Sequence, residues 1–278
     1  MRCTIVAGIC LALTSTLATV NGANAQERAQ SNVDLPRYPA ISPDGTEIVF
    51  SWRGDLWKVN ADGGIAIRLT SHPASESRSA WSPDGTRIAF MSDRTGSDNL
   101  YLMNVDGTDV RTVTEIDRPL SLAGFGVDGD GNEVLTFTSY LEADVYRAPR
   151  MYMVSTSGGF IDRVNGAYGT NPVVHADGNL VLFERGGSSW TRRHYRGSDA
   201  RDVWVYDRAN DAFRQLTNWT GNDGMAKWAG PRTVIFASDR ELDRVNLYQM
   251  SAGEGDAVSA RLTAFDDRDV YDFDVAAN

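Results

Sequence analysis

The chain has 278 residues, of which 42% are hydrophobic and 23% are charged, and its formal net charge at pH 7 is −10. This balance is that of a globular protein and excludes an intrinsically disordered chain. Because an acidic surface repels phosphate backbones, the charge also argues against nucleic-acid binding.

The first 25 residues have the pattern of a secretory signal peptide. Arg2 begins the segment, an apolar stretch runs from Ile5 to Val20, and Ala23-Asn24-Ala25 forms a cleavage pattern that would leave Gln26 first. The alternative is a membrane anchor, although the stretch is short and rich in threonine for a span of about 20 residues. We therefore expect an exported protein, most simply a periplasmic one.

Both cysteines, Cys3 and Cys10, lie inside this segment. The rest of the chain would then carry no disulfide, no thiolate nucleophile and no metal bound by cysteine.

After a short lead-in at 26–37, the chain begins a repeat of about 40 residues. The letters SPDGT stand at 42–46 and again at 82–86, each time before an Ile-x-Phe run. The first unit, 38–77, reads as four short strands at Tyr38–Ser42, Glu47–Trp52, Asp55–Asn60 and Ile65–Leu69. Asp-Gly turns separate the first strand from the second and the third from the fourth, because glycine supplies the positive φ of tight hairpins.

Four more units follow at about 78–120, 121–169, 170–223 and 224–268. The fourth strand closes on Leu-Thr or Val-Thr in four of the five units, at Leu69, Val113, Leu216 and Leu262. Four antiparallel strands at a period of 40 to 50 residues are typical of a β-propeller blade. We predict an all-β fold, a β-propeller over 38–278 with five four-stranded antiparallel blades and the first strand of a sixth.

That partial sixth blade would occupy 269–278, with Val270–Val275 as its strand. A lone strand leaves an open sheet edge, which soluble proteins avoid, so we interpret the sequence as a piece of a longer chain. The alternative is a five-bladed ring that this strand closes by joining the first blade.

The usual catalytic and metal-binding motifs are absent from the sequence. It contains no Gly-x-Ser-x-Gly and no His-Glu-x-x-His, and no metal-ligand spacing connects its histidines, His72, His175 and His194. The acidic run 127–133 resembles a calcium loop only in part, because Glu133 stands where an EF-hand loop needs glycine. A widened hairpin turn is the better interpretation, and we expect no cofactor, no metal site and no catalytic residue.

One basic insertion stands out in this acidic chain. The run WTRRHYRGSDARDVWVYD at 190–207 precedes the third strand of the fourth blade and carries Arg192, Arg193, Arg196 and Arg201. Arginine binds carboxylates in a bidentate way, so the insertion is a candidate contact for a peptide carboxylate. The residues of this candidate site are Arg193, Arg196, Trp190 and Tyr195.

A structural brace is the alternative for the same insertion. In that interpretation its arginines pair with Asp199 and Asp202 and hold neighbouring blades or domains together.

Four motifs resemble the N-terminal six-bladed propeller of the tricorn protease family. They are GDLWKVN at 54–60, LAGFGVDGDGN at 122–132, HYRG at 194–197 and RDVWVYD at 201–207. The resemblance covers 38–278. The SPDG, SDR and LYLM spellings are less specific, because TolB-type propellers and propellers fused to amidohydrolase or prolyl-oligopeptidase domains share them.

The resemblance implies a serine peptidase that trims oligopeptides. In that family the catalytic Ser, His and Glu lie in a later core domain, so none is carried over to this chain, which we expect to be inactive alone. Its expected partners are oligopeptides or a protein at the propeller axis, together with C-terminal domains of the same polypeptide. The founding members are intracellular, whereas this chain begins with an export pattern.

Two other functions remain open from the sequence. One is a stand-alone TolB-like periplasmic propeller that binds proteins. The other is the N-terminal propeller of an enzyme of the amidohydrolase or prolyl-oligopeptidase type.

Overall fold

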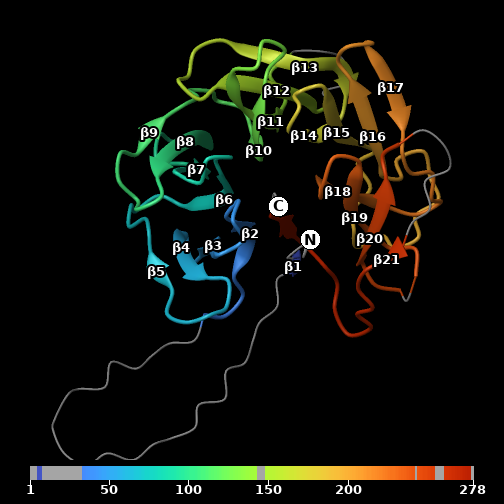
Figure 1. The fold of residues 1–278 in the computed structure, drawn as a ribbon, viewed down its shortest axis with the longest axis horizontal. Helices are drawn as coiled ribbons and strands as arrows, with labels where there is room; N and C mark the ends of the chain where they lie inside the picture. The colour runs from blue at the N-terminus through green and yellow to red at the C-terminus, as the bar shows by residue number, and fades with distance from the viewer. Residues whose placement is uncertain (1–4, 8–32, 143–147, 242, 254–259, 277–278) are drawn as a thin grey trace, which may run out of the picture.

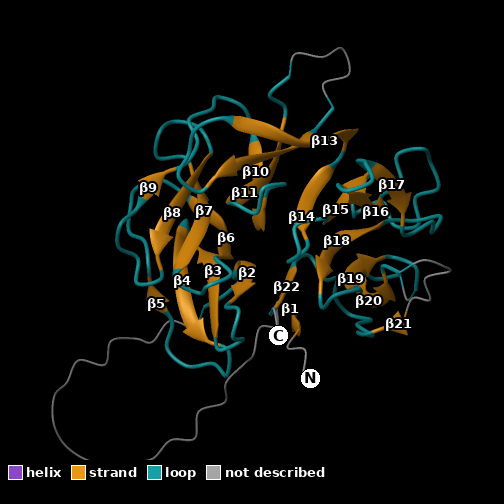
Figure 2. Cartoon of the chain, turned by 45° about the horizontal axis from the view of Figure 1, so that its top comes forward, coloured by secondary structure: helices purple, strands orange, loops and turns teal. Residues whose placement is uncertain are grey.

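The computed structural model describes residues 5–7, 33–142, 148–241, 243–253 and 260–276. Five four-stranded antiparallel sheets surround a central axis, as Figure 1 shows, and Figure 2 shows the same ring tilted, with loops joining the strands. In every sheet the strands lie in chain order from the axis outward. Within the described ranges, no helix is long and apolar enough to cross a membrane.

The strand bounds define the blades. Blade one has β2 (Arg37–Ile41), β3 (Glu47–Trp52), β4 (Asp55–Asn60) and β5 (Ile67–Arg68), and blade two has β6 (Glu76–Trp81), β7 (Arg87–Ser92), β8 (Asn99–Asn104) and β9 (Arg111–Thr112). Blade three has β10 (Leu120–Val127), β11 (Glu133–Ser139), β12 (Arg150–Ser155) and β13 (Ile161–Tyr168). Blade four has β14 (Thr170–Val174), β15 (Leu180–Arg185), β16 (Asp202–Asp207) and β17 (Ala212–Gln215), and blade five has β18 (Asp223–Trp228), β19 (Thr233–Ser238), β20 (Asn246–Ser251) and β21 (Ala260–Arg261).

A sixth sheet has two strands, β22 (Phe273–Val275) and β1 (Ile5–Ala7), paired antiparallel. β22 contacts β2 of blade one and β18 of blade five, near the centre of Figure 1. Asp274 joins the two blades, because its Oδ2 accepts the Ile41 N–H at 3.1 Å and its Oδ1 lies 3.5 Å from Lys227 Nζ. β22 therefore occupies the place of the innermost strand of a sixth blade.

This arrangement confirms the predicted propeller of five blades and a partial sixth. The alternative of a ring closed by pairing with blade one is wrong for the described residues, since β22 pairs with β1. β1 belongs to the segment predicted to be a signal peptide, and most of that segment lies outside the described residues. Its cleavage stays a prediction.

Each blade carries the same aromatic pair between its second and third strands. A phenylalanine of the second strand lies directly opposite an aromatic residue of the third, and all five phenylalanines are at most 6% exposed. The pairs are Phe50 with Trp57, Phe90 with Tyr101, Phe137 with Tyr152, Phe183 with Trp204, and Phe236 with Tyr248. Cross-strand aromatic pairs of this kind stabilise a sheet by about 0.5–1.5 kcal/mol beyond the area they bury.

The apolar cores lie between blades. Because side chains alternate along a strand, one sheet face packs on the preceding blade and the other on the following blade. In blade two, Phe90 packs with Val49 of blade one, whereas Ala89 and Leu100 pack with Leu135 of blade three. Each blade is thus stabilised by its neighbours.

The Leu-Thr and Val-Thr dipeptides found in the sequence close four of the five blades in the same way. The threonine hydroxyl accepts the backbone N–H at the start of the third strand, at 2.9 Å in every case. The four pairs are Thr70 with Leu56, Thr114 with Leu100, Thr217 with Val203 and Thr263 with Leu247. The repeated spelling therefore satisfies a buried backbone donor.

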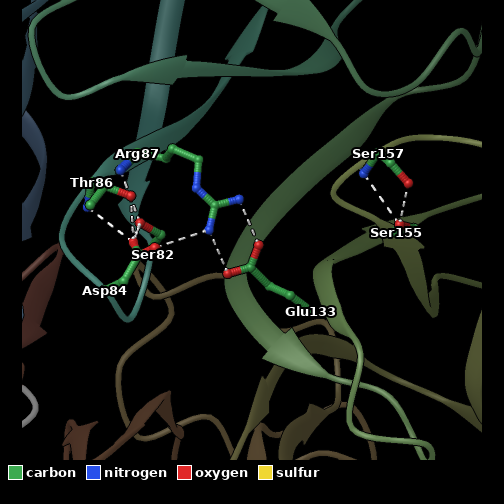
Figure 3. A network of polar contacts seen from close by, with 7 residues as sticks. All are labelled: Ser82, Asp84, Thr86, Arg87, Glu133, Ser155 and Ser157. Atoms are coloured by element: carbon green, nitrogen blue, oxygen red, sulfur yellow. Dashed lines mark hydrogen bonds and ion pairs between the residues drawn. The ribbon is translucent and has the colours of Figure 1, made fainter.

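The two SPDGT turns are built around their serine and aspartate. In the second turn, Ser82 Oγ donates to Asp84 Oδ1 at 2.5 Å, and the same oxygen accepts the Thr86 N–H at 3.0 Å (Figure 3). These hydrogen bonds hold the pKa of Asp84 well below its usual range, with the Ser82 hydroxyl as the largest cause. Next to this turn, Arg87 forms a two-pronged ion pair with Glu133 of blade three, at 2.8 and 3.0 Å.

The innermost strands all contain a β-bulge near the axis. In four blades the bulge holds a non-glycine residue in the left-handed region: Tyr38, Arg78, Asn171 and Met225, with φ between 49° and 55°. This conformation is costly outside glycine, so the surrounding structure must hold it.

At two of these four bulges the preceding blade does so through one side chain. Thr138 Oγ1 accepts the Asn171 N–H at 2.9 Å, and Glu184 Oε1 accepts the Met225 N–H at 2.7 Å. Between blades two and three, Met91 Sδ accepts the Leu122 N–H at 3.4 Å. In each case the acceptor is the residue that directly follows the second-strand phenylalanine.

The blade-closing threonine can be tested with Thr114→Val. The variant loses the acceptor for the Leu100 N–H and leaves that donor buried, so we expect the free energy of unfolding in urea to fall by about 1–3 kcal/mol. Thr112→Val, on the exposed strand β9, is the matched control and should change it little. Equal effects of the two substitutions would contradict this role.

Candidate functional site

The basic insertion lies on one end of the ring, which we call the connector face. At this end each second strand turns into the third and each blade leads into the next, because strand directions alternate within a blade. Residues 186–201, here named the arginine loop, join β15 to β16 on this face.

The arginine loop is anchored at its end by Arg201. Its Nε donates to the Ser188 carbonyl at 2.6 Å, and its Nη1 lies 3.2 Å from Glu184 Oε2. Glu184 is 4% exposed, and its other oxygen accepts the Met225 N–H and an Asn171 side-chain N–H at 3.0 Å. One carboxylate therefore ties the loop to the innermost strands of blades four and five.

The middle of the loop is tied to other elements. Arg193 Nη2 lies 2.7 Å from Asp269 Oδ2 in the connection between β21 and β22. The His194 N–H donates to Asp239 Oδ2 at 2.9 Å, between β19 and β20. Asn222 Nδ2, just before β18, donates to the Arg192 carbonyl at 3.1 Å. The loop braces blade four against blade five and β22.

The arginines of the loop pair with other carboxylates than the predicted brace had suggested. The structure places Arg193 on Asp269 and Arg201 on Glu184, whereas the sequence suggested Asp199 and Asp202. Asp199 instead accepts the Gly187 N–H at 2.8 Å within the loop. Its carboxylate is occupied in shaping the loop.

The four predicted peptide contacts have different surroundings. Trp190 is partly buried and packs against the core cluster that contains Val270 and Phe273. Tyr195 lies under the Arg192 guanidinium, whose carbon is 4.0 Å from the ring centroid. Arg193 is ion-paired, and Arg196 is exposed with no hydrogen bond or ion pair to any described residue.

Sequence reasoning missed the acidic residues of this network, Glu184, Asp239 and Asp269. They lie in three different blade segments, up to 76 residues from their partners. The only sequence signal concerned Asp239, which belongs to a Ser-Asp-Arg motif that occurs at 92–94 and again at 238–240. In both copies the arginine reaches a fully buried carboxylate that begins the blade: Arg94 contacts Glu76 at 2.7 Å, and Arg240 contacts Asp223 at 2.8 Å.

Two carboxyl groups near the loop, the half-buried Asp202 and the buried Asp223, have raised pKa values. Burial, with the nearby Asp223 charge, raises the pKa of Asp202 to about 6. Burial also raises the pKa of Asp223, although Arg240 opposes the shift. Both residues begin strands at the connector face, so burial disfavours the ionised forms of two carboxyl groups on this side of the junction between blades four and five.

Among the described residues, no group of three or more His, Cys, Asp or Glu side chains is placed to hold a metal ion. The acidic run 127–133 forms a turn in which Asp128 Oδ1 accepts the N–H groups of Asp130 and Asn132 at 2.9 and 2.8 Å.

The mouth of the axis on the connector face carries charges of both signs. Asp272, just before β22, is partly buried, and burial raises its pKa while Lys227 and Arg78 lower it. The Arg78 guanidinium carbon lies 4.4 Å from the centroid of the Tyr38 ring. Cations of blades two and five thus face the start of β22.

Comparisons with known proteins agree with this architecture. A family model described as "Tricorn protease N-terminal beta propeller domain" matches residues 33–278. Tricorn protease homolog 1 from Streptomyces coelicolor is 28% identical over 210 residues, which cover 74% of this chain and 19% of that protein.

Two solved structures show the same fold at low identity. TolB from Acinetobacter baumannii aligns with a TM-score of 0.64 at 19% identity, over 87% of this chain and 57% of that one. The tricorn protease crystal structure aligns with a TM-score of 0.64 at 19% identity, over 83% of this chain and 23% of that one. The chain therefore spans about a fifth of the length of its Streptomyces relative.

Proposed function

Because this chain belongs to the family of tricorn protease N-terminal β-propeller domains, we propose that it guides or gates oligopeptides for a tricorn-like serine peptidase. The observation that carries the proposal is the arginine loop, which presents Arg196, exposed and without an ion pair to any described residue, on the connector face of an acidic protein. An unpaired guanidinium held on a braced loop suits a carboxylate ligand.

The brace and the binding role are compatible in this proposal. Arg193 uses Nη2 for Asp269 and is 34% exposed, so further guanidinium donors remain for a peptide carboxylate. The contacts of Arg201 and His194 hold the loop in place before a peptide arrives, which lowers the entropy cost of binding.

The peptidase chemistry belongs, in this proposal, to other domains of the same polypeptide. The relatives bearing the tricorn name are several times longer than this chain. The described propeller contributes binding and positioning, and we expect it to hydrolyse no peptide by itself.

A TolB-like role is the second candidate, favoured by the fold match to TolB. In that case the connector face would dock a folded protein, and short peptides would not bind it. An N-terminal propeller of an amidohydrolase or prolyl-oligopeptidase-type enzyme is compatible with the same fold.

We also propose export, most simply to the periplasm, from the pattern of Arg2, the apolar stretch and Ala23-Asn24-Ala25. The expected result is that protein recovered from the cell envelope starts at Gln26 by N-terminal sequencing. A protein that keeps Met1 in the cytoplasm would contradict export.

Peptide binding by the full chain tests the arginine loop. Calorimetry with one hexapeptide, carrying either a free or an amidated C-terminus, should show about tenfold tighter binding of the free form, since a charge-assisted contact is worth about 1.5 kcal/mol. Arg196→Gln and Arg193→Gln should remove this preference, whereas Arg111→Gln, on the exposed outer strand β9, should keep it.

The peptide should remain uncleaved after incubation with the full chain. Equal affinity for both forms, unchanged by Arg196→Gln and Arg193→Gln, would leave the brace as the only role of the loop. Binding of neither form, with capture of a folded protein instead, would favour the TolB-like candidate.

A further inference from the structure

The junction between blades one and two departs from the pattern of the next three junctions. At those three the residue after the second-strand phenylalanine reaches the innermost strand of the next blade, as Met91, Thr138 and Glu184 do. In blade one this residue is Ser51, and its buried Oγ has no hydrogen-bond partner. Serine lacks the γ-methyl group of threonine and the longer side chains of methionine and glutamate, so it fills less space.

A cavity of about 260 Å³ lies at this junction. Blade one contributes Arg37, Ser51 and Trp52 to its wall, and blade two contributes Glu76. Arg37 and Ser51 are direct cross-strand partners at the connector end of β2 and β3, so both belong to one side of the sheet. The volume is below that of pockets for drug-sized ligands and suits a molecule of about one residue in size.

Two acceptors in the wall are buried without partners. The Glu76 side chain has 0% exposure; its Oε1 binds Arg94 Nη2 at 2.7 Å, but its Oε2 makes no hydrogen bond. Ser51 Oγ is the second such atom. Buried polar atoms are nearly always hydrogen-bonded in proteins, so these two oxygens are suited to accept hydrogen bonds from a bound molecule.

The cavity wall also carries two arginines that the described residues neutralise only weakly or not at all. Arg37 is exposed and makes no hydrogen bond or ion pair with a described residue. Arg53 stacks over the Trp52 ring at 4.5 Å, and its carboxylate neighbour Asp34 is 3.7 Å away, with both side chains more than two-thirds exposed. Such a loose surface pair leaves Arg53 available to a ligand.

Two further residues of the cavity wall have a left-handed backbone conformation. Leu35 and Arg53, which both line the cavity, have φ values of 51° and 53° outside the repeated bulge position. Residues held in the left-handed region cluster at ligand-binding sites, where the surroundings fix a geometry that the chain would otherwise avoid.

We propose that this cavity binds a small carboxylate that carries N–H or O–H donors next to the carboxylate. Arg37, with Arg53 at the rim, holds the carboxylate, Ser51 Oγ and Glu76 Oε2 accept the donors, and Trp52 packs against the ligand body. Two sources share this chemistry: an acylated amino-acid residue with a free carboxylate, and a sugar acid. The site lies on blades one and two, away from the arginine loop, and goes beyond the proposed function.

The test is titration of the full chain with three probes by calorimetry or ligand-observed NMR. They are N-acetylalanine, D-glucuronate and the uncharged N-acetylalanine amide. We expect saturable binding of at least one carboxylate probe below about 10 mM and at least tenfold weaker binding of the amide. Binding of N-acetylalanine alone or of D-glucuronate alone identifies the source.

Substitutions locate the site. Ser51→Met places in blade one the residue that blade two has at Met91, so it should fill the cavity and weaken binding at least tenfold in a folded protein. Arg37→Gln should weaken carboxylate binding about tenfold, whereas the matched control Arg111→Gln on β9 should leave it unchanged. Arg193→Gln and Arg196→Gln should also leave the small probes unaffected, which separates this site from the arginine loop.

Three results would overturn the proposal. One is the lack of saturable binding of both carboxylate probes up to about 10 mM. The second is equal binding of the amide, which removes the carboxylate contact. The third is binding that Arg37→Gln leaves intact, because this exposed side chain can be replaced without disturbing the fold. None of these results bears on the peptide preference assigned to the arginine loop.

Discussion

The ring depends on one contact repeated at the junctions between blades, in which a side chain of one blade holds the bulged innermost strand of the next. Thr138 and Glu184 each accept a backbone N–H from a residue in the left-handed conformation, Asn171 and Met225. The conformation is unfavourable for these residue types, so it persists because the neighbouring blade supplies the acceptor. The backbone conformation at these bulges therefore depends on the blade that precedes them.

The same contact positions the surface that we assign to ligand binding. Glu184 accepts the Met225 N–H and also anchors Arg201, so the arginine loop is tied to the innermost strand of blade five. At the first junction Ser51 leaves this contact unmade, and a cavity takes its place. The contact between a side chain and a bulge therefore positions the arginine loop at one junction. At the junction where the contact is missing, the cavity forms the second candidate site.

Much of the fold was predictable from the sequence because its signals are local. The SPDGT turns and the Leu-Thr dipeptides specify hydrogen bonds within a blade, and their period of about 40 residues reveals the blade. The partners of the arginine loop were not predictable, since Arg193 finds Asp269 across 76 residues. The cavity beside Ser51 was also hidden, because strand periodicity shows which face a residue occupies but not which side chain of the next blade lies opposite.

The most direct test of this account is amide hydrogen exchange in the folded full chain. We predict that the amides of Asn171 and Met225 exchange as slowly as those of the central strands beside them, because a buried side chain accepts each hydrogen. The Arg78 amide, whose counterpart acceptor Ser51 Oγ makes no hydrogen bond, should exchange faster than both. Rapid exchange at Asn171 and Met225, or equal protection at all three bulges, would contradict the claim that these side chains hold the ring together.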